Sequence, residues 1–321
     1  MKDVRRKIIT AAAMTIMLAG CNSEEGLPTG ESVQDMAYFS ATIQAPGTRA
    51  YDQIWEADDE IGISGTSGDK TYTNVRYFTR DNSGSFNPKD EREKIYFQND
   101  EEVTFTAYYP WNDLQGTTAI AADTREQQIQ KTFDFLWAQA TGQKKVNDSK
   151  VQFQFSHKMA KVVLTIKKGS DVNYNEVKAA VLSLGGFKPE GTFSVTDGAT
   201  AATGEALSAE WTFAGNPTGN DNAPLEKDDT KETVSYTLLL FPQEFGTTLP
   251  FTAELTGSQS FTTNLDFTEA NRQKDGTNAK NEWVAGRQYN MGIVLNKTGV
   301  VVEGCTIAPW EEVTGNDAIA Q

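Results

Sequence analysis

The sequence has very few of the residues from which most metal and redox sites are built. Its 321 residues include two cysteines and one histidine, which leaves almost no material for a zinc site or a disulfide framework. Acidic clusters at Asp58-Asp59-Glu60 and Asp228-Asp229 could in principle hold Ca²⁺. Acidic loops of this kind are more often solvated, so we predict no metal and no cofactor.

Positive charge is also scarce. The chain carries 29 Lys and Arg against 44 Asp and Glu, a formal net charge of −15. Such a surface repels phosphate groups, which argues against nucleic-acid partners and against adsorption to anionic lipid headgroups.

The motifs that organise common enzyme sites are absent. We find no phosphate-binding loop, no dinucleotide-binding glycine pattern and no Gly-x-Ser-x-Gly elbow. A serine or cysteine triad would have to use His157, which lies within a strand-like pattern and is expected to bond a neighbouring backbone group. We therefore predict no catalytic residue and a protein that is not an enzyme.

The one apolar run near the N-terminus is too short to span a bilayer as a stable helix. It covers about a dozen residues, Ile8–Ala19, follows a basic start, and ends in Leu18-Ala19-Gly20-Cys21. Small residues directly before a cysteine resemble the lipobox of bacterial lipoproteins. The alternative is an ordinary secretory signal followed by an incidental cysteine.

The lipobox resemblance implies that residues 1–20 are a signal peptide, removed before an acylated, palmitate-bearing Cys21. Several acyl chains at about 0.8 kcal/mol per buried methylene make a lasting membrane anchor. Residues 21–36 are polar with Gly and Pro and read as a flexible tether. Cys305 would then have no disulfide partner, and we expect it to be a small apolar strand residue.

What the chain does contain is typical of an all-β protein, because short apolar runs alternate with Gly, Thr, Asn and Asp. Val151–Lys168 has the strongest pattern: Phe153, Phe155 and His157 alternate with polar residues, and an almost continuous apolar run follows. We predict one long strand there, closing a first domain (37–168) and leading into a second (169–321). Val177–Phe187 is compatible with a helix, but its neighbours favour a strand. Further predicted strands are Met36–Ala45, Tyr72–Phe78, Val103–Pro110, Thr233–Phe241, Leu249–Leu255, Ser260–Phe267, Gln288–Leu295 and Val300–Ile307.

Several short motifs, taken in order, resemble the fimbrillin (Mfa-like) family of type V pili. Each is weak alone, and together they extend over most of the chain from Ala37 to Trp310. The motifs are Thr48-Arg49-Ala50, Trp55 with Asp59–Ile63, Phe105–Pro110, Phe155-Ser-His157, Trp283–Ile293 and Ile307–Trp310.

This resemblance implies two transthyretin-like β-sandwiches in tandem and a place in pili of Gram-negative bacteria. Its members are exported as outer-membrane lipoproteins, and in pilus-forming members an arginine-specific protease removes the first strand. Here the cut would fall between Arg49 and Ala50. A sandwich that loses a strand exposes unpaired backbone and apolar pockets that a strand from another subunit can fill. Val300–Trp310 is the candidate donor strand.

Arg49 has competitors at Arg76, Arg80, Arg92 and Arg125. Its place between the Pro46-Gly47 break and an acidic segment favours it, and the alternative is an ordinary loop arginine. Without cleavage the protein would stay tethered through Cys21.

Two functions remain open at this stage. The first is a structural or adhesive pilus subunit, at the stalk, the tip or the anchor. The second is a lipid-anchored surface protein that binds glycans, for which six tryptophans and many Asp and Asn residues are the support. Expected partners are other pilus subunits, the outer membrane, and a host or bacterial surface receptor or glycan.

Overall fold

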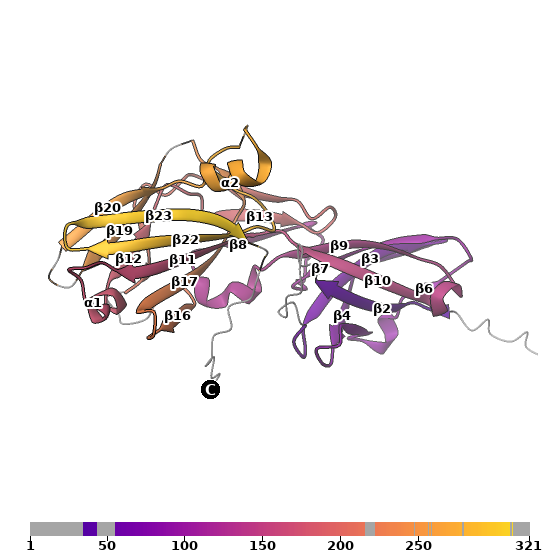
Figure 1. Ribbon diagram of the computed structural model, residues 1–321. Helices are drawn as coiled ribbons and strands as arrows, with labels where there is room; N and C mark the ends of the chain where they lie inside the picture. The colour runs from indigo at the N-terminus through magenta and orange to yellow at the C-terminus, as the bar shows by residue number, and fades with distance from the viewer. Residues whose placement is uncertain are drawn as a thin grey trace, which may run out of the picture. The chain divides into compact units, whose positions relative to one another are not determined.

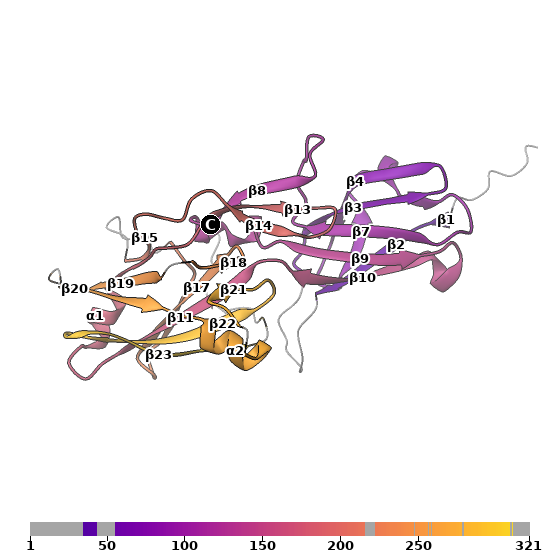
Figure 2. The same ribbon diagram turned by 90° about the horizontal axis from the view of Figure 1, so that it is seen from above.

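A computed structural model describes residues 35–43, 55–215, 222–246, 248–255, 257, 259–277, 279–308 and 310. Strands dominate it (Figures 1 and 2), so the all-β class predicted from composition is confirmed. Within these residues no helix is long and apolar enough to cross a membrane.

The early strands form a closed barrel in the order β10-β2-β5-β4-β3-β7-β9. Their inward positions are apolar and alternate with more exposed ones, as in β10, because only one face meets the core. Aromatic side chains from several strands fill this core, including Phe39, Phe105, Phe153 and Phe155. The strands are β2 (Tyr38–Ile43), β3 (Glu60–Ser67), β4 (Lys70–Thr79), β5 (Ser85–Pro88), β7 (Val103–Tyr109), β9 (Leu136–Gly142) and β10 (Lys150–His157), and beside them β1 (Asp35–Met36) pairs with β6 (Tyr96–Phe97).

The later strands form a five-stranded sheet, β16-β17-β11-β22-β23, and a four-stranded sheet, β15-β12-β19-β20. Buried side chains from both sheets make one large apolar cluster. The strands are β11 (Ala160–Lys168), β12 (Val181–Leu184), β15 (Trp211–Ala214), β16 (Leu225–Asp228), β17 (Thr233–Leu240), β19 (Leu249–Leu255), β20 (Gln259–Leu265), β22 (Gln288–Asn296) and β23 (Gly299–Ala308).

A third sheet combines strands from distant parts of the chain, in the order β14-β13-β8. Its residues contribute Ile120 and Phe193 to a separate apolar cluster that also holds Met159 and Trp310. The strands of this sheet are β8 (Ala119–Asp123), β13 (Glu190–Ser194) and β14 (Thr200–Thr203). Elsewhere, β18 (Gln243–Glu244) pairs with β21 (Glu282–Trp283). The helical elements are α1 (Tyr174–Lys178), α2 (Thr268–Asp275) and the 3-10 segments Glu91–Glu93, Gln127–Thr132 and Val146–Ser149.

The single long strand predicted over Val151–Lys168 is wrong. β10 ends at His157 in the barrel, and β11 begins at Ala160 between β17 and β22 of the five-stranded sheet. The sequence pattern changes because the environment changes. β10 buries one face, whereas β11 is a central strand whose residues are nearly all buried or half-buried.

The strand predicted over Val177–Phe187 is correct only in its middle, as β12. Its start belongs to helix α1, which begins with a capping box. The Asn173 side chain accepts a hydrogen bond from the backbone N–H of Glu176, and the Glu176 carboxylate accepts one from the backbone N–H of Asn173. These bonds satisfy donors at the helix start that would otherwise be unpaired.

Candidate functional site

The predicted processing residues Arg49 and Ala50 and the predicted lipid site Cys21 lie outside the described residues. The first described strand before Arg49 is β2, which ends at Ile43, and the described chain resumes at Trp55. Strand β2 and its neighbours are the described elements next to the predicted cut.

Strand β2 is hydrogen-bonded along both edges. It runs parallel to β10, from Tyr38 opposite Lys150 to Ile43 opposite Phe155, and antiparallel to β5. Next to these ladders, the N–H of Ala41 donates to the carbonyl of Gly84 at 2.8 Å, and the indole N–H of Trp55 donates to the carbonyl of Ala41 at 2.9 Å. Strand β2 is thus an integral barrel strand with Trp55 bonded to its backbone.

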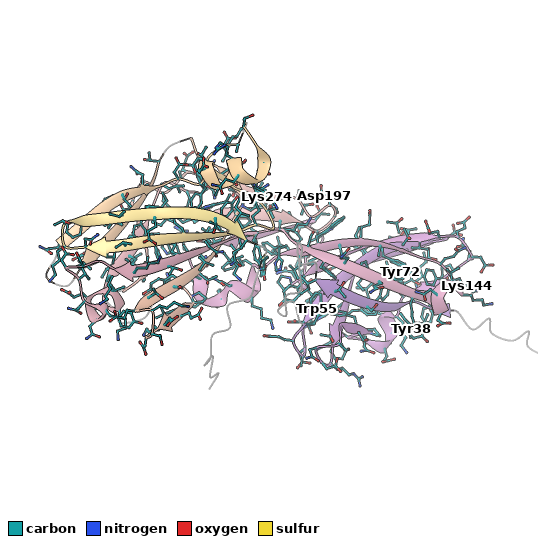
Figure 3. The ribbon with its side chains drawn as sticks, in the orientation of Figure 1. Tyr38, Trp55, Tyr72, Lys144, Asp197 and Lys274 are labelled. Atoms are coloured by element: carbon teal, nitrogen blue, oxygen red, sulfur yellow. The ribbon has the colours of Figure 1, made fainter. Side chains whose placement is uncertain are left out.

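The inward side chains of β2 belong to the barrel core. Phe39 is 3% exposed, and its ring centroid lies 5.1 Å from Tyr77, 5.3 Å from Phe105 and 5.8 Å from Phe153. The adjacent Tyr38 faces outward and is 52% exposed (Figure 3). A barrel without β2 would therefore have an apolar groove between two strands with unpaired backbone groups.

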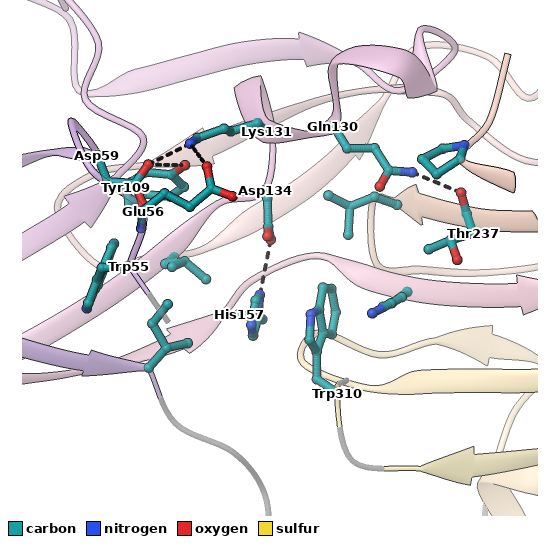
Figure 4. Close-up of a pocket in the computed structure, with 15 residues that line it drawn as sticks. Trp55, Glu56, Asp59, Tyr109, Gln130, Lys131, Asp134, His157, Thr237 and Trp310 are labelled. Atoms are coloured by element: carbon teal, nitrogen blue, oxygen red, sulfur yellow. Dashed lines mark hydrogen bonds and ion pairs between the residues drawn. The ribbon is translucent and has the colours of Figure 1, made fainter. Parts of the chain in front are cut away.

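A pocket of about 320 Å³ lies where β2 ends (Figure 4). Its wall combines the last described residue of β2 with side chains from β10, β11 and the C-terminal end of the described chain. The residues are Ile43, Trp55, Glu56, Asp59, Tyr109, Gln130, Lys131, Asp134, Leu136, His157, Lys161, Pro224, Thr237, Leu239 and Trp310.

His157 is the last residue of β10 and lies in this wall. Its Nδ1 is 3.1 Å from Oδ1 of Asp134, so its partner is a carboxylate and not the backbone group we expected. The imidazole stacks on Trp310, with centroids 4.0 Å apart and planes 15° apart. Nε2 is buried without a hydrogen-bond partner among the described residues, and no serine or cysteine lines the pocket.

The acidic side of the pocket is held by one lysine. Lys131 Nζ lies 2.6 Å from Oε2 of Glu56 and 2.8 Å from Oδ1 of Asp59, and the Tyr109 hydroxyl donates to the same Asp59 oxygen at 3.2 Å. Burial, together with the Asp59 charge, raises the pKa of Tyr109 far above its usual value, so the phenol stays a proton donor.

Three acidic residues of the clusters considered for Ca²⁺ form ion pairs within the protein. Asp59 pairs with Lys131, Glu60 with Arg76 and Lys89, and Asp228 with Lys231. Across the described ranges, no group of three or more His, Cys, Asp or Glu residues is arranged to hold a metal ion.

The tryptophans considered for glycan stacking are packed inside or partly covered. Trp55, Trp283 and Trp310 are almost fully buried. The guanidinium of Arg76 lies over the Trp111 ring, 4.2 Å from its centroid. Trp137 and Trp211 are half-buried, so none of the six tryptophans is classed as exposed. The stacked pair of Trp310 and His157 was not predicted, because residues so far apart in the sequence carry no local periodic signal.

Comparison with known proteins gives consistent matches. A family model described as fimbrillin-like matches residues 48–310. A Bacteroides uniformis protein named as a fimbrium subunit, Fim1C, is 31% identical over 327 residues, which cover 97% of each chain.

Two solved structures with similar folds come from Bacteroides species. A Bacteroides ovatus protein described as a cell adhesion protein superposes with a TM-score of 0.69 at 24% identity, over 88% of this chain and 99% of that one. A Bacteroides uniformis protein with the same description gives 0.64 at 28% identity, over 86% and 99%.

Proposed function

Because the chain belongs to the fimbrillin-like family of fimbrial and adhesion proteins, which are not enzymes, we propose that it is a fimbrial subunit that assembles by strand exchange after its first strand is removed. The observation that carries this proposal is the position of β2, which is hydrogen-bonded on both edges and contributes Phe39 to the barrel core. Removing such a strand creates a deep, directional acceptor groove that a strand from a second subunit can fill.

Export as a lipoprotein is part of the proposal. Cleavage before Cys21 and acylation of that residue would hold the precursor at the outer membrane, and a cut after Arg49 would separate the folded subunit from its anchor. The lipobox-like Leu18-Ala19-Gly20-Cys21 supports this step. An uncut chain would stay at the membrane as an anchor or adhesin.

The surroundings of two competing arginines argue against them as processing sites. Arg76 lies within β4 and is ion-paired with Glu60. Arg125 forms ion pairs with Asp123 and Glu190. A protease needs an extended and accessible segment, and residues held within strands or ion-pair networks are poor substrates.

The two-domain organisation stays within this proposal, with a changed boundary. β11 pairs with β17 and β22, strands that follow residue 169, so we place the boundary between the two domains near Lys158 and not after Lys168. The donor would be the C-terminal strand, which here lies at the edge of its own sheet as β23.

Treating the purified chain with an arginine-specific protease tests the proposal. We expect one early cut between Arg49 and Ala50 by mass spectrometry, followed by ladders of SDS-resistant polymer. Arg49→Gln should block both, and Arg92→Gln, at an arginine whose side chain is 88% exposed, should block neither. A subunit cut after Arg49 that stays monomeric would contradict strand exchange.

Expression of the full chain and of a Cys21 variant in a Gram-negative host tests the proposed lipid anchor. Metabolic palmitate labelling should mark the full chain and be lost in Cys21→Ser. An uncut, lipidated monomer that is retarded on glycan-affinity gels would favour the glycan-binding function instead.

A further inference from the structure

The C-terminal strand β23 is held to its sheet by backbone hydrogen bonds and by half-buried side chains, among them Val300, Val302 and Ile307. It pairs with β22 from Gly299 opposite Asn296 to Ala308 opposite Gln288, and it is the outermost strand of its sheet in the described chain. None of its ten residues is buried, whereas its neighbour β22 buries alternate side chains such as Met291 and Ile293. Backbone hydrogen bonds and half-buried contacts therefore supply most of its attachment.

Trp310, two residues beyond β23, is the exception. It is 3% exposed, packs in the apolar cluster that contains Met159 and Phe135, and stacks on His157. Lys161 Nζ lies 5.7 Å from the centroid of the ring. Among the described residues from Gly299 onward, Trp310 is thus the single buried side chain, and large aromatic anchors of this kind dominate the attachment of a segment.

The pocket wall that contains Trp310 also contains the end of β2. Ile43 and Trp55 line it, and they are the described residues on either side of the segment that includes Arg49. His157, on which Trp310 stacks, lies two residues beyond Phe155, the β10 residue that pairs with Ile43. The end of the N-terminal strand and the C-terminal anchor therefore line one pocket.

We propose that Trp310 is a latch that keeps β23 on its own sheet, and that removal of β2 weakens this latch by taking Ile43 out of the shared pocket. The inference rests on the proposed processing after Arg49 and adds an order to it, because β23 becomes free to leave only when the acceptor groove has opened. Opening the wall exposes apolar surface around Trp310 to water, which reduces the free energy that holds the ring in place. An uncut subunit would thereby be protected from donating its strand prematurely.

Hydrogen exchange of the full chain, measured by mass spectrometry on peptides from β23, tests the latch. Replacing Trp310→Ala should raise β23 exchange by at least about tenfold, since tenfold corresponds to only about 1.4 kcal/mol of opening free energy. Ile43→Ala should raise it by about threefold, because it removes part of the wall but leaves the ring. Val301→Ala, at a β23 residue that is 52% exposed, is the matched control and should change it less than twofold.

Peptides from β11 and β17 show in each variant whether the five-stranded sheet stays folded. Unchanged β23 protection in Trp310→Ala, with these peptides still protected, overturns the latch. The monomeric fraction of protein cut after Arg49, separated from polymer and from the released N-terminal segment, should exchange β23 at least as fast as Ile43→Ala does. If β23 protection in this fraction is unchanged, the coupling fails while the processing proposal stands. If the protease leaves Arg49 intact, the processing proposal fails and Ile43→Ala alone decides the coupling.

Discussion

Replacing Phe39→Ala would measure how firmly the first strand is built into the barrel. The Phe39 ring is 3% exposed and contacts three aromatic rings, edge-on against Tyr77 and Phe105 and stacked with Phe153. Removing a buried phenylalanine ring loses its transfer free energy and leaves a cavity, which typically costs about 3–5 kcal/mol. The edge-on ring pairs add to the upper part of that range. We therefore expect the free energy of unfolding of the barrel to fall by about 3–5 kcal/mol.

The assay is hydrogen exchange at increasing urea, followed on peptides from β2, β7 and β10, which reports the stability of the barrel alone. Tyr38→Ala is the matched control, because it lies on the same strand, removes a ring of similar size and is 52% exposed. It should cost less than about 0.5 kcal/mol. A Phe39→Ala loss below about 1 kcal/mol, or equal to that of Tyr38→Ala, would refute the packing of β2 into the core and with it the depth of the groove.

Two further predictions concern the surroundings of β2 and the barrel surface. Gly84→Ala should destabilise the barrel by about 1–3 kcal/mol, because φ is +72° and the new Cβ would lie 2.2 Å from the carbonyl oxygen of Ala41. Gly116→Ala is the control, because Gly116 has a φ of +84° but no atom lies within 4 Å of the new Cβ. Equal melting temperatures of the two variants would contradict a clash between residue 84 and the Ala41 carbonyl. Burial alone would raise the pKa of Glu60, but hydrogen bonds and charges from Arg76 and a neighbouring lysine outweigh it and hold the pKa below its ordinary 4.5. A carboxyl group whose pKa is lowered by folding stabilises the folded state at pH values above its unfolded-state pKa. This stabilisation is lost as the pH falls through the folded-state pKa. Glu60→Gln should therefore cost up to about 1 kcal/mol at pH 7 and nothing well below pH 4.5 in urea titrations, whereas a difference that persists in acid would exclude the ion pairs as its source.

The sequence by itself determined the class of the protein. The scarcity of cysteine and histidine, the absence of enzyme motifs and the alternation of short apolar runs with turn residues are local properties. These properties predicted an all-β chain. The short motifs, taken in order, carried the fimbrillin resemblance that the family match confirms. The pattern also changes at Lys158, where a half-buried strand is followed by a central strand that needs different side chains.

The sequence contains one local helix signal that the strand prediction over Val177–Phe187 did not use. Asn173 and Glu176 have the spacing of a capping box, and they start helix α1 where neighbouring strands suggested another strand. The motif spans only four residues, so it can be recognised from the sequence alone.

Only the tertiary structure decided which strands and side chains meet. The parallel pairing of β2 with β10, the separation of β10 from β11, and the stack of Trp310 on His157 all join residues that no periodicity connects. A sequence pattern records how each residue faces its own core, because burial selects the side chain. It does not record the partner across the core, since many apolar side chains satisfy the same burial and only packing selects among them.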